Sequence, residues 1–210
     1  VDGCRRSVPA WRRVIKFTSE SPGKSAMRLE VHLHADIPML EGVSKKQIEQ
    51  ALAPLLDYLD AEGMADVKSL EPDEPGLRYD DKELMLLMCW SGEVGRSFHP
   101  ALDAALDNLG PLCYEAVEVE LTLYLQNGEQ ESRLLFVGPT AHAIHEAQRR
   151  CMIEDVTAVL ARQFAKEPVA EVVALVERLF EQDWKERALE EKKPERAFEI
   201  ATRPSRKHLH

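Results

Sequence analysis

The chain has 210 residues, of which 44% are hydrophobic, and a formal net charge of −10. This composition supports one domain, or one domain with an appendage, and no apolar run approaches the ~20 residues of a membrane span. The charge is uneven, because residues 27–189 carry 15 basic and 31 acidic side chains. That acidic surface repels phosphate backbones, so we expect neither nucleic acid nor membrane as a partner.

The two ends are basic and lack periodic patterns. Residues 1–26 predict a disordered or non-native extension, and we expect Met27, which opens the first periodic segment, to be the start. No apolar region of signal-peptide length follows the arginine pairs, so the sequence does not predict secretion. Residues 191–210 are polar and contain proline, which predicts a disordered tail.

Four cysteines are spread along the chain without a CxxC pair: Cys4, Cys89, Cys113 and Cys151. Cys89 and Cys113 fall in predicted strands and Cys151 in a predicted helix, where free cysteine behaves as a small hydrophobic residue. This pattern is typical of a reducing compartment, and we expect the cytoplasm.

Three segments of the first half predict strands. Met27–Ile37 alternates between apolar and polar residues, as a half-buried strand does. Ala65–Leu70 predicts a short strand, and the acidic segment Glu71–Asp81 predicts an exposed connection. Glu83–Ser91 contains an unbroken apolar run, which indicates a central strand covered on both faces. A buried helical turn is the competing interpretation of that run.

A hairpin follows in the second half. Ala116–Leu125 alternates apolar with polar residues, and Ser132–Val137 predicts the returning strand. Asn127-Gly128 between them favours a type I′ turn.

Two amphipathic helices lie between the strands. Ser44 and Gln47 predict a capping box at the start of the first, and Gly63 predicts its end. Pro54 lies inside this helix and is expected to kink it or cost a hydrogen bond. The second is expected from Ser97–Pro100 to Gly110-Pro111.

Two longer helices complete the chain. Thr140 predicts the N-cap of the first, and Glu167-Pro168 predicts the break before the second. The short break predicts an antiparallel helical hairpin over residues 139–190 that packs on the domain or on a partner.

The order of these elements predicts an α+β two-layer sandwich. Its first six elements follow the ferredoxin-like order β-α-β-β-α-β over residues 27–138, with an added edge strand from the hairpin at Asn127-Gly128. By analogy of order, the strands would lie as 5-4-1-3-2 with both short helices on one face.

Two clusters of polar side chains are candidates for metal binding or catalysis. His32 and His34 project to one face of their strand, where Glu118 and Glu120 of the neighbouring strand would join them. Two imidazoles and a carboxylate are ligands that zinc, iron or nickel uses. A solvated sheet face has the same composition, and this interpretation stays open.

The second cluster is His142-x-x-His145-Glu146, at the start of the third helix. The spacing places both histidines on one helix surface but is not the zincin arrangement. The alternative is a polar helix face. Gly92–Ser97 offers an anion-binding loop or, alternatively, a plain connecting turn. A divalent transition metal at one of the histidine clusters is therefore an alternative, and the sequence predicts no other cofactor.

The sequence contains no motif for a specific activity and favours an uncharacterised acidic protein. We expect a non-enzymatic interaction or self-association module, with a second copy or another protein as the partner, because apolar surfaces lack an evident burial partner. The alternative is a metal-dependent enzyme with a His/carboxylate site on the open sheet face.

Overall fold

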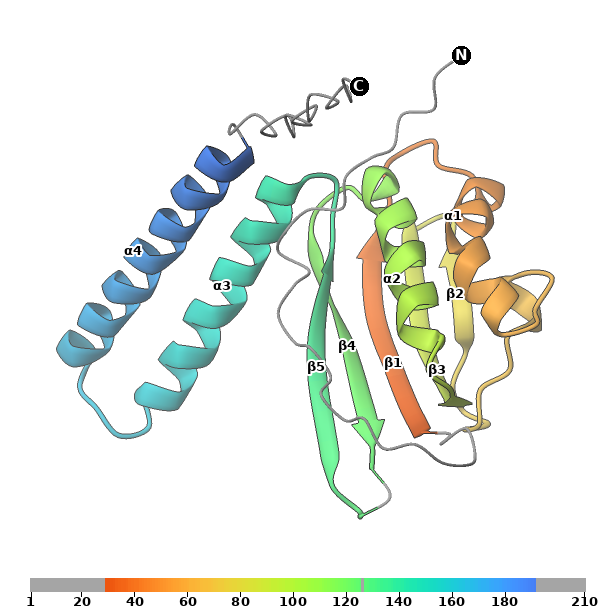
Figure 1. The fold of residues 1–210 in the computed structure, drawn as a ribbon, viewed down its shortest axis with the longest axis horizontal. Coiled ribbons are helices and arrows are strands. Elements are labelled where there is room, and N and C mark those ends of the chain that lie inside the picture. Colours follow the sequence, from red (N-terminus) through yellow and green to blue (C-terminus); the bar gives the residue numbers. More distant parts are fainter. Residues whose placement is uncertain (1–28, 126, 192–210) are drawn as a thin grey trace, which may run out of the picture.

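A computed structural model describes residues 29–125 and 127–191 (Figure 1). The predictions for residues 1–26, Met27 and residues 192–210 lie outside this part of the chain. Within the described ranges, no helix is both long enough and apolar enough to cross a membrane.

Residues 29–125 and 127–191 contain one antiparallel sheet of five strands. They are β1 (Leu29–Pro38), β2 (Gly76–Asp80), β3 (Met85–Val94), β4 (Val117–Tyr124) and β5 (Gln130–Val137). From edge to edge they lie in the order β2-β3-β1-β4-β5. The helices α1 (Lys45–Tyr58) and α2 (Phe98–Leu109) cover one face of the sheet (Figure 1). The α+β class is therefore confirmed.

The core lies between this face and the two helices. Alternate residues of β1 point into it and are buried, as the alternation of the segment predicts: Val31, Leu33, Ala35 and Ile37. Phe98 of α2 is fully buried, with its ring between those of Tyr58 and Trp90 at centroid distances of 5.6 and 6.0 Å. Burial of such large apolar side chains supplies most of the favourable free energy of folding.

Contacts and backbone angles within a few residues determine where α1 begins and ends. The capping box is confirmed, since Ser44 Oγ accepts from the Gln47 amide and the Gln47 side chain accepts from the Ser44 amide. The helix continues through Pro54 but ends at Tyr58, before the predicted stop at Gly63. The reason is a backbone reversal at Asp60, whose φ of 54° lies in the left-handed region.

The position of β2 differs from the sequence prediction. Residues 65–70 form no strand, and Met64–Asp66 is a 3₁₀ turn. The strand is Gly76–Asp80, inside the segment that was expected to be an exposed connection. Contacts distant in sequence hold it there: Leu77 is buried, and the Tyr79 hydroxyl donates to the Val43 carbonyl at 3.2 Å.

The strand β3 confirms the strand interpretation of the apolar run, and the helical turn is wrong. Its burial alternates, however. Leu86, Met88 and Trp90 are buried under the helices, whereas Leu87 and Cys89 on the other face are only half-buried. The expectation that β3 is covered on both faces is therefore met on one face and only in part on the other, where Ser91 is buried.

The β4–β5 hairpin is confirmed, with Val117 opposite Val137 and Tyr124 opposite Gln130. The type I′ turn is wrong, because the Leu125 amide donates to the Glu129 carbonyl at 2.9 Å, which leaves a loop of more than two residues in which Gly128 has a φ of 82°. The Gly128 amide donates to the Leu125 carbonyl at 2.9 Å. A loop longer than two residues needs one left-handed position, not two.

The last two helices are α3 (Ala141–Leu160) and α4 (Lys166–Glu191), which run side by side in opposite directions (Figure 1). Thr140 caps α3 as predicted, by accepting from the Ala143 amide. The break comes earlier than Glu167-Pro168, and both residues lie in the first turn of α4. Proline is tolerated there because the first amides of a helix have no intrahelical partner.

Candidate functional site

The face of the sheet away from α1 and α2 carries most of the polar side chains considered above. We call it the open face. In the register of β1 with β3, His32 lies opposite Ser91 and His34 lies opposite Cys89. Towards β4, His34 lies opposite Glu120. Because cross-strand partners point to the same face, these side chains share one surface.

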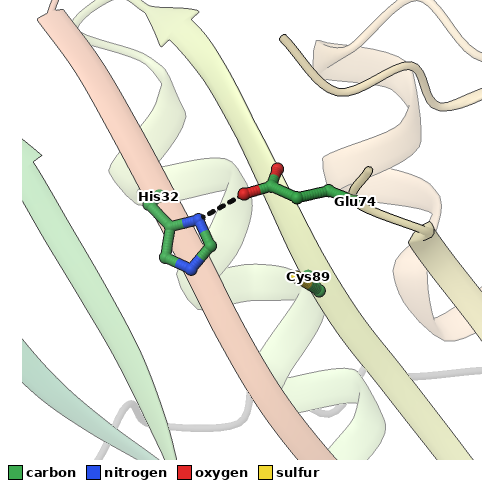
Figure 2. Close-up of side chains that lie close together, drawn as sticks. All are labelled: His32, Glu74 and Cys89. Carbon is green, nitrogen blue, oxygen red and sulfur yellow. Dashed lines mark ion pairs between the residues drawn. The ribbon is translucent and has the colours of Figure 1, made fainter. Parts of the chain in front are cut away.

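His32 belongs to a hydrogen-bond network that reaches Glu74, in the loop before β2 (Figure 2). Its Nδ1 lies 2.9 Å from Glu74 Oε1 and 3.0 Å from Ser91 Oγ. Ser91 Oγ donates to Glu74 Oε1 at 3.0 Å, and Ser69 Oγ donates to the other carboxylate oxygen. Ser69 Oγ also accepts from the Ser91 amide at 2.8 Å. The carboxylate is thus fixed on both oxygens.

Cys89 lies beside this pair. One ligand atom each from His32, Glu74 and Cys89 lies within 4.8 Å of the other two, and all three residues are half-buried. Burial raises the pKa of the Cys89 thiol, and the nearby carboxylates of Glu74 and Asp36 raise it further. Burial alone would also raise the pKa of Glu74, but hydrogen bonds from Ser69 and Ser91 and the His32 ring together lower it. The arrangement combines a nitrogen, an oxygen and a sulfur ligand.

The other residues predicted on this face lie apart from the group. The exposed His34 ring is stacked on that of His32, with centroids 6.4 Å apart. His34, Glu118 and Glu120 line a separate hollow of about 330 Å³, together with Arg150 of α3. Glu118 Oε2 accepts from the thiol of Cys151, also on α3, at 3.5 Å.

His142 and His145 lie against aromatic rings of α4 and away from the open-face group. The ring of Trp184 is 5.1 Å from that of His142 and 4.9 Å from that of His145. His145 is buried, and its Nε2 has no hydrogen bond and lies 3.7 Å from a carboxylate oxygen of Asp183. Burial lowers the pKa of His145, and the positive charge of Arg187 lowers it further.

Residues 92–97 favour the connecting-turn interpretation over an anion site. Gly92 belongs to β3, so only three residues separate the strand from α2. The Gly95 amide is already used, since it donates to the Tyr58 hydroxyl at 2.7 Å.

A second feature is apolar and lies on the helical hairpin and β5. We define the hairpin face as the large apolar side chains exposed there: Leu134, Met152, Val159, Phe164, Val172, Leu175 and Leu179. Met152 and Val159 are seven residues apart and so lie on one side of α3. Val172, Leu175 and Leu179 are three and four residues apart and so lie on one side of α4.

A groove of about 500 Å³ opens between β5, α3 and α4. Leu134 and Phe136 line it from β5, Met152 from α3, and Leu179 and Phe180 from α4. Because Met152 and Leu179 both line the groove, the exposed sides of α3 and α4 open in the same direction.

The sequence offered His32 as a candidate metal ligand but did not single out Cys89 or Glu74, which the structure places beside it. A signal for Cys89 was present, because alternation along β3 puts Cys89 and Ser91 on the face that β1 gives to His32 and His34. Glu74 had no such signal, since it lies in a loop whose path only the fold determines.

Comparison with known proteins gives one finding about the family. A family model described as "Family of unknown function (DUF6806)" matches residues 29–181, more than half of the chain. The matched range covers the sheet, α3 and most of α4. The searches of curated proteins and of solved structures found no match.

Proposed function

Because the chain belongs to this family of unknown function, we propose from its own surface that it is a non-enzymatic module that self-associates through the hairpin face. The observation that carries the proposal is the exposure of seven large apolar side chains on the hairpin and the adjoining β5 strand. Val159 is 62% exposed, Phe164 57% and Leu179 54%. Large apolar side chains exposed on one side of a helical hairpin are typical of a site of protein association.

Charge favours a second copy of the chain as the occupant. Residues 141–187 carry seven basic and nine acidic side chains, so two hairpins repel each other only weakly. Residues 29–137 carry seven basic and 22 acidic side chains, a net charge of −15. Two copies meeting through their sheets would bring these like charges together, whereas contact through the hairpins separates them.

The shape of the hairpin also fits a partner of the same kind. Val172, Leu175 and Leu179 repeat at intervals of three and four residues, which is the spacing of a helix–helix seam. The apolar groove lies beside α3 and α4 near the sheet, and Phe164 lies in the turn that joins the two helices. A two-fold arrangement with antiparallel hairpins would place each turn near the groove of the other copy.

The proposal also includes the topology of the fold and the cellular compartment of the protein. We infer that the first six elements follow the ferredoxin-like order, with β5 added at the edge of the sheet. This ferredoxin-like order is supported by two observations: β1 lies between β3 and β4, and α1 and α2 lie on one face of the sheet. A cytoplasmic setting is supported by the free thiols of Cys89, Cys113 and Cys151.

Sedimentation velocity of the full chain tests the proposal. We expect the wild type to sediment as a species of twice the chain mass of 23.8 kDa. The double variant Leu175→Glu/Leu179→Glu should sediment as a monomer, because a dimer would bury two unpaired carboxylates per chain. Both side chains are exposed in the single chain, so the variant should keep its fold and its far-UV circular dichroism.

Leu70→Glu is the matched control. Leu70 is 55% exposed, close to the 54% of Leu179, but it lies outside the hairpin, between the 3₁₀ turn and β2. This variant should remain dimeric. A wild type that is monomeric at every concentration tested would overturn the proposal, as would a dimer that the double substitution leaves intact.

A further inference from the structure

Three separate segments bring metal-binding side chains together on the open face, and none of these side chains belongs to the hairpin face. His32 comes from β1, Cys89 from β3, and Glu74 from the loop before β2 (Figure 2). The sequence separates His32 from Cys89 by 57 positions, and only the β1–β3 pairing places them on adjacent strands.

The spacing of the three ligand atoms is close to what a tetrahedral ion needs. Zinc bonds of about 2.0–2.3 Å to nitrogen, oxygen and sulfur put neighbouring ligand atoms roughly 3.3–3.6 Å apart. The atoms of His32, Glu74 and Cys89 all lie within 4.8 Å of one another, and His32 Nδ1 is 2.9 Å from Glu74 Oε1. Adjustments of roughly 1 Å in the positions of these side chains would therefore bring the three ligand atoms to the spacing of one ion.

A supporting shell already orients the carboxylate. Ser69 donates to one oxygen of Glu74, and Ser91 donates to the other. Ser69 is itself held in place by the Ser91 amide at 2.8 Å. Metal-binding carboxylates are commonly held by hydrogen bonds of this kind, which fix the direction of the ligand atom.

The surrounding charge favours a cation. The net charge of −15 on residues 29–137 creates a field that attracts positive ions to this part of the chain. A divalent ion bound between the Cys89 thiol and Glu74 would displace the thiol proton to solvent.

We infer that His32 Nδ1, one oxygen of Glu74 and Cys89 Sγ bind a single divalent transition-metal ion of the zinc class. One thiolate, one imidazole and one carboxylate match the ligand preferences of zinc and cobalt, and exclude magnesium and calcium, which prefer oxygen ligands alone. With three protein ligands, a tetrahedral ion keeps a fourth position for water or a small ligand.

Cobalt(II) titration of the full chain, purified without a histidine tag and treated with chelator, is the test. Thiolate ligation gives a charge-transfer band in the near ultraviolet, and tetrahedral geometry gives strong visible bands. We expect both to saturate at one cobalt per chain, and zinc to remove them by competition.

Substitutions then assign the ligands. Cys89→Ser should remove the charge-transfer band, and His32→Ala should abolish stoichiometric binding. Ser69→Ala leaves the three ligands in place but removes a hydrogen bond to Glu74, so zinc affinity should fall roughly 10–100-fold. Circular dichroism and urea unfolding of each variant separate loss of a ligand from loss of the fold.

Two matched controls use neighbouring residues of the same type. Cys151 is also half-buried beside a carboxylate, with its thiol 3.5 Å from Glu118, and Cys151→Ser should keep the band. His34 stacks on His32 but lies outside the ligand group, and His34→Ala should still bind one cobalt.

The inference is overturned if the folded wild type binds no cobalt or zinc, because the hydrogen bonds among His32, Glu74 and Ser91 would then be the whole role of the cluster. It is also overturned if Cys89→Ser keeps the charge-transfer band, or if Cys151→Ser removes it. Since no ligand belongs to the hairpin face, these results do not depend on whether the chain is a dimer.

Discussion

The sheet with α1 and α2 differs from the helical hairpin in how much of its apolar surface the single chain buries. The first region places residues such as Leu33, Leu52 and Phe98 in one continuous core with almost no exposure. In the hairpin, Ala147 and Val169 are the buried hydrophobic residues among those described, whereas Phe164 and Leu179 are more than half exposed. Among the described residues, one region completes its core, and the other leaves an apolar side exposed, which under our proposal a second copy covers.

A matched pair of phenylalanines gives the largest expected difference between the regions. Phe98→Ala should lower the free energy of unfolding by roughly 3–5 kcal/mol, because it opens a cavity between Tyr58 and Trp90. Phe164→Ala should change the free energy of unfolding of the monomer by no more than about 0.5 kcal/mol, because the ring is 57% exposed. The same substitution should weaken self-association. Urea unfolding at low protein concentration and sedimentation measure the two effects. Equal losses of monomer stability would contradict the contrast.

The junction between the two regions gives an intermediate effect. Gly138 connects β5 to α3, and a Cβ at this position would lie 2.8 Å from the Cα of Ala116 and 3.3 Å from Ile144 Cγ1. Gly138→Ala should therefore destabilise the protein by about 1–3 kcal/mol through overpacking. Gly128→Ala is not a suitable control because of its positive φ, whereas Ala143→Gly changes the nearby first turn of α3 without a clash. Unfolding curves in urea compare the variants, and an unchanged midpoint for Gly138→Ala would show that the junction is loosely packed.

The pH dependence of the hairpin gives the smallest effect. His145 faces Asp183 and Arg187 from α4 and has His142 and Glu146 beside it on α3, and burial is the largest cause of its lowered pKa. The unfolded chain therefore binds a proton at higher pH than the folded chain does. The contribution of neutral His145 to stability is present above the ordinary histidine pKa of about 6.5. It is lost as pH falls through the lowered pKa that His145 has in the folded chain.

The variant His145→Gln removes the titrating group and should make the unfolding free energy less dependent on pH across that window. The remaining dependence includes His99, whose pKa is lowered by burial and by Arg133, so the double variant with His99→Gln should flatten the profile further. A profile that His145→Gln leaves unchanged would contradict a neutral, buried His145.

Features of the fold that depend on neighbouring residues could be predicted from the sequence, and features that depend on distant contacts could not. The capping box of Ser44 and Gln47 and the β4–β5 pairing are local, and both are confirmed. The strand Gly76–Asp80 was missed because it has only Leu77 and Tyr79 as inward apolar residues. Its place is fixed by pairing with β3 and by the contact of Tyr79 with Val43. The sequence of this acidic segment has no periodic pattern from which these contacts could be predicted.

The same distinction applies to the candidate metal site. His32 was identifiable because the alternation of its strand is local, and Cys89 would have followed from alternation along the neighbouring strand. Glu74 depends on the path of a loop, and Ser69 and Ser91 orient it through hydrogen bonds that only the folded chain forms. The sequence predicted apolar surface without an evident burial partner, but the periodic stripes of α3 and α4 do not reveal which of their members a single chain buries.

Hydrogen–deuterium exchange of the wild type at two protein concentrations, above and below the dissociation constant, tests the central claim most directly. If a second copy covers the hairpin face, amides of α3 and α4 should exchange more slowly at the higher concentration. Amides of β1 and β3 should exchange at the same rate at both, because the core around them is complete within one chain. Exchange in α3 and α4 that is independent of concentration would contradict the claim that this face is an interface between copies.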